Sequence, residues 1–263
     1  MFDYVDIHSH LYFPDFDTDR EEEIAKLKEN KIATITVGTD FDSSQKAIGL
    51  ASKHDNIFAS VGQHPGDITL DNLIYDISYI KDLSINPKVV AIGECGLDYY
   101  RMSSDNTKLK DVQKKIFKDH IDLALKTNLP LMLHIRPQKR TQGAYLDALE
   151  ILENQAKISG DKLCGNVHFF VGNLDVLKRF LDIGFSVSFT GVITFAHDYD
   201  DLIRYVPLNM IMSETDAPFV SPVPYRGKRN SPLFVPEVVK RIAKIREESF
   251  EDVKIALQNN ALR

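Results

Sequence analysis

The chain has 263 residues, of which 43% are hydrophobic and 27% are charged. This composition is typical of a soluble globular protein and excludes a fibrous or low-complexity chain. The formal net charge of -6 argues against a protein that coats nucleic acid through bulk positive charge, but it leaves room for a local basic patch. The two cysteines, Cys95 and Cys164, form no CxxC pattern, which argues against a disulfide framework and suits a reducing compartment.

The N-terminal segment has no basic region followed by an apolar stretch, so the sequence predicts no signal peptide. No apolar run approaches the roughly 20 residues that are needed to span a bilayer. We therefore expect a cytoplasmic protein that does not enter a membrane, and no segment of the chain indicates an obligate protein partner.

Strand-like and helix-like segments alternate along the whole chain. Apolar and β-branched runs indicate strands, whereas apolar positions at helical spacing, acidic first turns and terminal Asn or Gly residues indicate helices. In chain order the prediction is a strand at 2–10, a helix at 19–30, a strand at 33–38, a helix at 43–54, a strand at 56–65, a helix at 73–83, a strand at 88–98, a helix at 107–127, a strand at 130–136, a helix at 144–155, a strand at 165–170, a helix at 174–184, strands at 185–191 and 208–216, and helices at 234–248 and 250–263.

Eight strands separated by helices fit either a (β/α)8 barrel or a doubly wound open sheet. Polar candidate site residues end predicted strands along the whole chain, whereas an open sheet would gather them where the strand order reverses. We therefore predict an α/β protein with a single TIM-like (β/α)8 barrel, residues 1–263 forming one domain, and an extra C-terminal helix.

Six candidate metal ligands follow apolar runs at the ends of predicted strands. A mixed set of imidazoles and carboxylates suits a hydrolytic centre with one or two divalent ions. In the first strand, alternation puts Asp6, His8 and His10 on one face. The six candidates are His8, His10, Glu94, His134, His168 and Asp216.

Glu94 follows the apolar run VVAIG, where a carboxylate is costly to bury without a partner. A metal ion supplies such a partner, and pairing with an Arg or Lys is the alternative. Cys95 points to the opposite face, where we expect a packed thiol. Asp98 lies just past this strand, and it suits either a hydrogen bond that orients a ligand histidine or a plain turn.

Asp216 ends the last predicted strand, where an aspartate can hold a metal and accept a proton from water. Glu214 shares its face and suits a supporting role or an ion pair. His64 precedes Pro65 at a strand end, and because the ligand set is already full we assign it to substrate positioning.

Basic residues follow two of the ligand-bearing strands of this acidic protein. Arg226, Lys228 and Arg229 lie in the loop VPYRGKRNSP, and Arg136 directly follows His134 and Ile135. Such residues can bind an anionic substrate such as a phosphodiester, and a solvated loop is the alternative. We predict that Arg136 and Arg229, together with His64, position phosphate.

The motifs DIHSH, VGQHP, GECGLDYY, LHIR, VHFF and ETDAPFVSPVPYRGKRNSP resemble those of the TatD-related deoxyribonucleases along the whole chain. The resemblance implies metal-dependent hydrolysis of phosphodiester bonds in DNA on a TIM-like barrel, in an exonuclease-like manner. It also implies two divalent ions, with Glu94 as the shared ligand and Asp216 and Glu94 as the catalytic residues. His8, His10 and Asp216 would complete one site, and His134 and His168 the other.

Two alternatives remain open from the sequence. An ester or amide hydrolase, such as an aminoacyl-tRNA deacylase or a small cyclic amidase, would use the same activated water. A non-catalytic, metal-dependent nucleic-acid-binding module is the third reading, and the complete ligand set argues against it. The two expected divalent ions are Mg, Mn or Zn, and the many histidines favour Zn, Mn or Fe over Mg.

Overall fold

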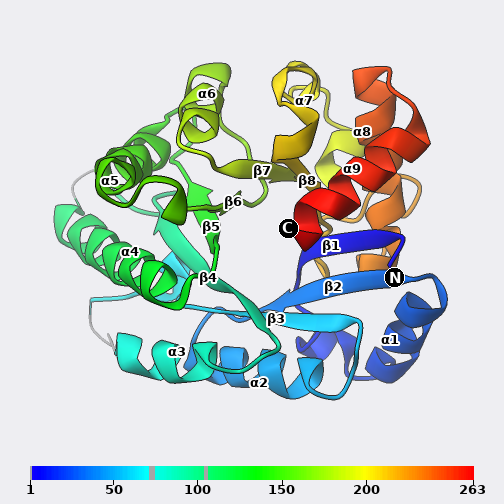
Figure 1. Cartoon of the computed structure of the whole chain (residues 1–263), viewed down its shortest axis with the longest axis horizontal. Helices are drawn as coiled ribbons and strands as arrows, with labels where there is room; N and C mark the ends of the chain where they lie inside the picture. The colour runs from blue at the N-terminus through cyan, green and yellow to red at the C-terminus, as the bar shows by residue number, and fades with distance from the viewer. Residues whose placement is uncertain (1, 71–74, 104–105) are drawn as a thin grey trace. The chain divides into compact units, whose positions relative to one another are not determined.

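The computed structural model describes residues 2–70, 75–103 and 106–263 (Figure 1). Within these residues, eight strands form one sheet in chain order, and the strand pairs of defined register are parallel. The strands are β1 (Tyr4–Ser9), β2 (Ile32–Val37), β3 (Ile57–Val61), β4 (Val89–Asp98), β5 (Leu131–Arg136), β6 (Gly165–Val167), β7 (Ser186–Phe189) and β8 (Ile211–Ser213).

Each strand is followed by a helix, and one further helix ends the chain. This alternation, together with the sheet order, confirms the predicted TIM-like (β/α)8 barrel with an extra C-terminal helix. The helices are α1 (Arg20–Glu29), α2 (Phe41–Ala51), α3 (Ile77–Ser84), α4 (Thr107–Thr127), α5 (Gly143–Ser159), α6 (Leu174–Asp182), α7 (Asp200–Tyr205), α8 (Val235–Arg246) and α9 (Phe250–Leu262).

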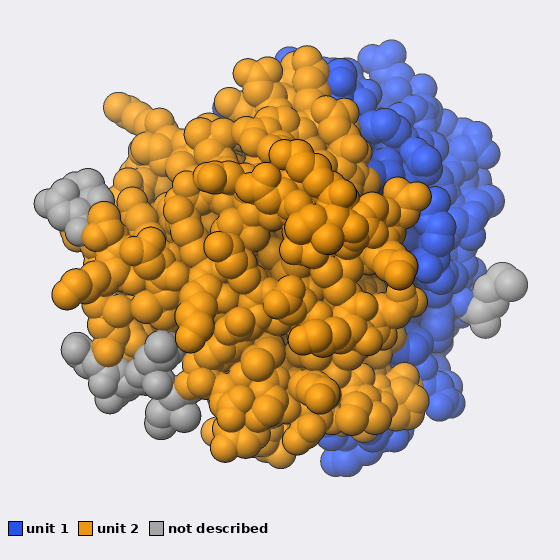
Figure 2. Space-filling view, turned by 60° about the vertical axis from the view of Figure 1, so that its left-hand side comes forward, with its two compact units in different colours: residues 1–36, 49–58, 186–263 blue, residues 37–48, 59–185 orange. Residues whose placement is uncertain are grey.

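The chain divides into two compact units, which Figure 2 distinguishes by colour. The first unit comprises residues 1–36, 49–58 and 186–263, and the second comprises residues 37–48 and 59–185. Each unit carries its own part of the predicted ligand set, so the two parts are described one after the other below.

In the first unit, the last strand lies beside the first. A parallel bridge joins Ser9 to Ala217, and the Ser213 hydroxyl donates a hydrogen bond to the Val5 carbonyl oxygen at 3.4 Å. This pairing brings the C-terminal end of β1 next to the segment that follows β8. Residues far apart in sequence therefore meet at the strand ends, where barrel enzymes carry their chemistry.

In the second unit, β4 forms a long pairing with β5. Gly96 has a φ of +138° and faces the backbone of His134, where an added Cβ would collide with the carbonyl oxygen. Cys95 is fully buried, as expected for a packed thiol, and burial raises the pKa of its thiol. The glycine therefore lets β4 approach β5 closely beside a predicted ligand.

Helix α4 has the predicted bounds because both of its ends are capped. The Asn106 side chain accepts a hydrogen bond from the Leu109 N–H at 3.2 Å, and Asn128 ends the helix with a left-handed φ of 55°. The buried face of α4 includes the polar residues Gln113 and His120 among apolar ones. These two polar side chains face the loops of the candidate site.

Several predicted elements differ in their bounds, and one observed helix was not predicted. β8 is shorter than the predicted 208–216, because residues 208–210 form a short 3-10 turn. α3 begins at Ile77, after the cap Asp76, while part of the helix predicted at 73–83 lies outside the described residues. α7 was not predicted, since its six residues are too few for a helical period to show.

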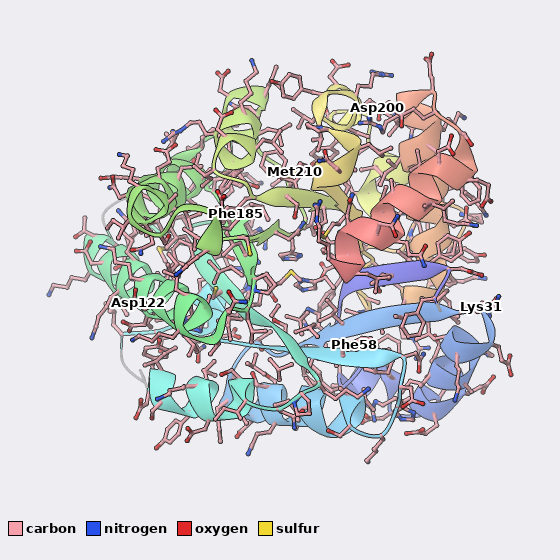
Figure 3. All side chains as sticks on the ribbon, viewed as in Figure 1. Lys31, Phe58, Asp122, Phe185, Asp200 and Met210 are labelled. Carbon is pink, nitrogen blue, oxygen red and sulfur yellow. The ribbon has the colours of Figure 1, made fainter. Side chains whose placement is uncertain are left out.

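Apolar side chains lie mainly in the interior, and charged side chains lie mainly at the surface (Figure 3). Phe185 is buried, whereas Lys31 and Asp122 are exposed on the outside. Among the described residues, no helix is both long and apolar enough to cross a membrane.

Candidate metal centre

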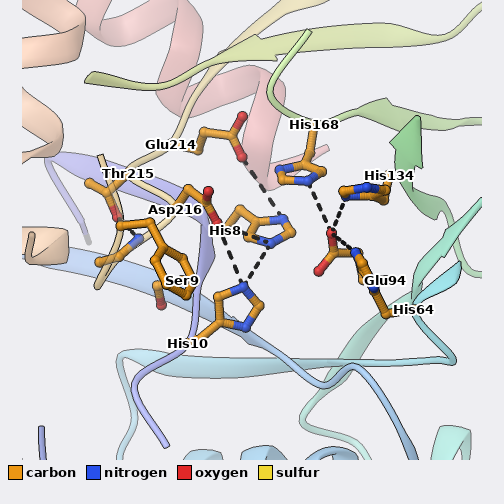
Figure 4. A network of polar contacts seen from close by, with 12 residues as sticks. His8, Ser9, His10, His64, Glu94, His134, His168, Glu214, Thr215 and Asp216 are labelled. Carbon is orange, nitrogen blue, oxygen red and sulfur yellow. Dashed lines mark hydrogen bonds and ion pairs between the residues drawn. The ribbon is translucent and has the colours of Figure 1, made fainter. Parts of the chain in front are cut away.

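In the first unit, three predicted ligands converge at the end of β1. The Nε2 atoms of His8 and His10 lie 3.3 Å apart, and the Asp216 Oδ1 lies 3.8 Å from the former and 3.6 Å from the latter (Figure 4). Both imidazoles are buried. The predicted placement of His8 and His10 on one face of the strand is therefore confirmed.

These separations fit a cation held between the three atoms. Ligand atoms about 2.1 Å from one ion lie about 3.0–3.4 Å from each other in octahedral or tetrahedral geometry. The distances of 3.3, 3.6 and 3.8 Å between these nitrogen and oxygen atoms are close to that range. Two nitrogens and a carboxylate oxygen that point at one spot form a donor set of the kind that binds zinc or manganese.

Backbone hydrogen bonds pin this part of the site. The Asp216 N–H donates to the His8 carbonyl oxygen at 2.9 Å, and the His10 N–H donates to the Ala217 carbonyl oxygen at 2.7 Å. Asp216 itself has a left-handed φ of 57°, which turns the chain just after β8. The side chain of Asp216 is thus placed by a tight turn rather than by a continued strand.

Asp6 holds the backbone next to the predicted ligands His8 and Asp216. Sequence reasoning assigned it no role. Its carboxylate accepts hydrogen bonds from the His8 N–H at 3.2 Å, the Thr215 N–H at 2.9 Å and the Thr215 hydroxyl at 2.6 Å. Burial raises the pKa of Asp6 to about 8. The signal was present, because alternation places Asp6 on the face of His8 and His10.

Glu214 also lies behind the ligands of the first unit. Its carboxylate accepts a hydrogen bond from the Ser188 hydroxyl at 2.9 Å and comes within 3.9 Å of the His8 Nδ1. Glu214 is fully buried. Of the two roles that the sequence left open, the structure supports the one in which Glu214 stands behind a predicted ligand, His8.

In the second unit, three imidazoles surround the buried carboxylate of Glu94. Its Oε1 lies 2.9 Å from His134 Nδ1, 3.1 Å from His168 Nε2 and 3.5 Å from His64 Nε2 (Figure 4). The second of these separations falls in the range expected for ligands that share one ion, and the first lies just below it. These contacts of Glu94 are with imidazoles rather than with an Arg or Lys.

Asp98 contacts the second ring nitrogen of His134. Its Oδ2 lies 3.0 Å from His134 Nε2, and its Oδ1 accepts a hydrogen bond from the Tyr100 N–H at 2.9 Å. An imidazole held between two carboxylates has a fixed ring orientation. Of the two readings of Asp98, the structure therefore supports the one in which it orients a histidine.

His64 lies with the predicted ligands rather than apart from them. Its Nε2, the Glu94 carboxylate and a His134 nitrogen all lie within 4.8 Å of one another. Its Nδ1 accepts a hydrogen bond from the Gly66 N–H at 3.0 Å, which leaves the proton of the neutral ring on Nε2. Burial lowers the pKa of His64 to about 3, so the ring is neutral at physiological pH.

Two buried polar residues of α4 hold the loops that carry His64 and Asp98, and sequence reasoning missed both. The Gln113 side chain donates to the Pro65 carbonyl oxygen at 2.7 Å and accepts from the Asp98 N–H at 3.0 Å. The His120 Nε2 accepts from the Gln63 N–H at 3.1 Å. Their spacing of seven residues puts them on one helix face, which was the available signal.

The predicted basic residues have different surroundings. Arg136 is exposed, with its guanidinium 3.9 Å from the centre of the Tyr100 ring. Arg229 forms a bidentate ion pair with Asp19 at 2.7 Å for each contact, and Glu23 lies 3.3 Å away. Two carboxylates thus offset the charge that was predicted to attract phosphate.

The chain matches the family model of TatD-related DNases over residues 5–263. The chain belongs to the TatD-related DNase family. It is 37% identical to the uncharacterized metal-dependent hydrolase YabD of Bacillus subtilis (strain 168), and the match covers 98% of this chain and 97% of YabD. It is 33% identical to the uncharacterized metal-dependent hydrolase YcfH of Escherichia coli (strain K12), over 98% and 94% of the two chains. The chain is therefore a metal-dependent hydrolase of the TatD family.

Solved structures of TatD proteins have the same fold. YJJV, a TatD homologue of Escherichia coli K12, is 26% identical with a TM-score of 0.84, covering 98% of this chain and 96% of YJJV. A TatD family hydrolase of Entamoeba histolytica has a TM-score of 0.83 at 18% identity, with the same coverage of 98% and 96%. The second likeness concerns the fold alone, and both agree with the predicted barrel.

Proposed function

We propose that this TatD-family chain hydrolyses phosphodiester bonds in DNA, in an exonuclease-like manner, and that residues 1–263 act as one hydrolase domain. The observation that carries the proposal is the pairing of buried imidazoles with carboxylates in both units. Glu94 has histidine nitrogens at 2.9 and 3.1 Å, and the Asp216 carboxylate lies 3.8 and 3.6 Å from the Nε2 atoms of His8 and His10. Donor sets of this kind serve metal-dependent hydrolysis.

The proposed site binds two divalent ions, Mg, Mn or Zn. His8, His10 and Asp216 would hold one of them, and Glu94, His134 and His168 the other. Bound divalent ions lower the pKa of water and offset negative charge on a phosphoryl group.

The side chains of the site have separate roles in this proposal. Asp216 accepts the proton of the attacking water, because its carboxylate retains some exposure beside two buried imidazoles. His64 donates a hydrogen bond from Nε2 to the phosphate of the substrate, since its Nδ1 already accepts one from the Gly66 N–H. Arg136, exposed beside the site, positions phosphate by charge. Arg229, whose charge is offset by Asp19, would contribute much less to phosphate binding than Arg136.

One observation favours the ester or amide hydrolase alternative in its small cyclic amidase form, because an aminoacyl-tRNA is a polyanion like DNA. Two arginines of the loop VPYRGKRNSP already form contacts within the protein. Arg229 pairs with Asp19, and Arg226 donates to the Ser221 carbonyl oxygen at 2.8 Å and stacks on Phe195. Fewer cations are then available for a polyanion than the sequence suggests.

A side-by-side assay separates the two functions. The purified protein, loaded with one defined divalent metal, would be given end-labelled single-stranded DNA, an aminoacyl-tRNA and a small cyclic amide. The proposal expects DNA to be cleaved fastest, with loss of activity on chelation. Faster release of the amino acid or opening of the amide, with intact DNA, would transfer the function to the alternative.

A further inference from the structure

An exposed phenylalanine stands beside the metal ligands of the first unit. Phe219 lies three residues after Asp216, and 48% of its surface is exposed. The centre of its ring is 6.2 Å from the ring of the ligand His10. A large, exposed apolar ring at the edge of a candidate catalytic site can form part of the surface that binds the substrate.

The backbone under this ring is held firmly. Asn230, which is fully buried, donates through its side chain to the carbonyl oxygens of Thr215, at 2.8 Å, and Phe219. The Asn230 N–H also donates to the Pro218 carbonyl oxygen at 3.0 Å. The next residue, Val220, has a positive φ of 53°, which is rare for a β-branched residue. Strain of this kind persists where surrounding contacts impose it, commonly at functional sites.

A second aromatic ring shapes the surface next to Phe219. Phe13 stacks on the imidazole of His10 at 4.9 Å with an interplanar angle of 24°, and its own edge meets Phe219 at 5.9 Å and 83°. The Phe13 carbonyl oxygen accepts from Arg20 at 3.0 Å, which fixes its position. Phe13 thus covers the ligand ring and braces Phe219.

We propose that the ring of Phe219 stacks on the nucleobase of the nucleotide that carries the scissile phosphate; this rests on the proposed nuclease function. Every nucleobase has a planar face, and protein aromatic rings bind single-stranded nucleic acid by stacking on such faces without reading sequence. A single rigid ring suits one planar base. A base paired within a duplex is not free to leave its neighbours without an unstacking cost. The enzyme therefore favours unpaired ends over blunt duplex ends.

The test compares DNA substrates with and without a base at the position of cleavage. Single-stranded oligonucleotides carry either a normal terminal nucleotide or an abasic one, at each end in turn, and a base-free diester, methyl p-nitrophenyl phosphate, reports metal-dependent chemistry alone. Phe219→Leu removes the aromatic face but keeps an apolar side chain, and Phe219→Tyr keeps the ring. Phe41→Leu, which alters an exposed phenylalanine of α2, is the matched control.

Wild type should cleave the normal terminus at least about fivefold faster than the abasic one, as expected from the free energy of one base–aromatic stack. Phe219→Leu should bring the ratio of the two cleavage rates close to one, with its rate on the base-free diester measured alongside, and Phe219→Tyr and Phe41→Leu should keep the wild-type ratio. A terminal 2-aminopurine should also lose fluorescence on binding wild type but not Phe219→Leu.

Two other results would overturn the proposal in distinguishable ways. Equal cleavage of normal and abasic termini by wild type, or unchanged discrimination in Phe219→Leu, would exclude the stacking subsite and leave the nuclease function standing. Absence of cleavage of every diester by metal-loaded wild type would overturn the proposed function, and the stacking subsite with it.

Discussion

The side-chain amide of Gln113 pairs with both backbone polar groups of Asp98, accepting from its N–H at 3.0 Å and donating to its carbonyl oxygen at 3.3 Å. The same amide reaches the Pro65 carbonyl oxygen, beside His64. Helix α4 therefore fixes two loops of the candidate site through one buried residue. This positioning depends on hydrogen bonds and not on shape alone.

Replacing Gln113 by Leu should lower the free energy of unfolding by about 2–3 kcal/mol, because buried backbone groups lose their partner. Hydrolytic activity should fall about tenfold as Asp98 and His64 lose their positions. Urea unfolding and steady-state rates measure both effects. The control Gln138→Leu removes one hydrogen bond, to the Met102 carbonyl oxygen at 2.7 Å, and should change both values little. Equal effects in the two variants would speak against a positioning role.

Asp6→Asn should weaken metal binding about 10- to 100-fold, because the buried carboxyl group that holds the backbone beside the predicted ligands His8 and Asp216 is replaced by an amide. Its oxygens accept hydrogen bonds next to His8 and Asp216, from the N–H groups of His8 and Thr215. Titration calorimetry of metal-stripped protein with Zn²⁺ or Mn²⁺ gives the affinities. Asp76→Asn is the control, since Asp76 accepts from the Ser78 N–H at an exposed helix start. Unchanged affinity in Asp6→Asn would contradict the assignment.

The fold could be predicted because alternating apolar runs and helical periods are local signals. Helix α4, with caps at Asn106 and Asn128, was predicted at its observed bounds. β8 was predicted too long, because the apolar residues before Ile211 fold as a 3-10 turn. Periodicity alone does not separate such a turn from a strand.

The candidate site was only partly predictable. His8 and His10 share a face by simple alternation, and Glu94 stands out at the end of an apolar run. Gln113 and His120 act from a helix on loops about 50 residues away, so no local pattern pairs them with their partners. The ion pair of Arg229 with Asp19, 210 residues apart, is of the same kind.

The two predicted phosphate-binding arginines should behave differently. Arg136→Met should raise KM for DNA about tenfold, as expected for loss of one charge-assisted contact. Arg229→Met should leave KM almost unchanged and lower stability by about 1 kcal/mol, since it breaks the partly exposed pair with Asp19. Asp19→Asn should match it in stability. A large rise of KM in Arg229→Met alone would instead place Arg229 at the substrate.

Stability should fall in mild acid because of His120. Burial lowers the pKa of this imidazole from 6.5 to about 4, so the unfolded chain takes up the proton first as the pH falls. The contribution of His120 to the free energy of unfolding is fully present above pH 6.5. It declines by about 2 kcal/mol as the pH falls toward about 4.5. Urea unfolding with chelator present measures it. His120→Gln keeps an acceptor for the Gln63 N–H and should show a smaller decline; an equal decline would assign the effect to other groups.

The central claim is metal-dependent cleavage of DNA at a site that includes Glu94. Its most direct test is single-turnover digestion of end-labelled single-stranded DNA by metal-stripped protein, with Mg, Mn and Zn restored singly. Glu94→Gln, which keeps the shape of the side chain but removes its charge, is the comparison. We predict cleavage by wild type with at least one metal and none by Glu94→Gln. Intact DNA with every metal, in wild-type protein that binds two ions, would contradict the account.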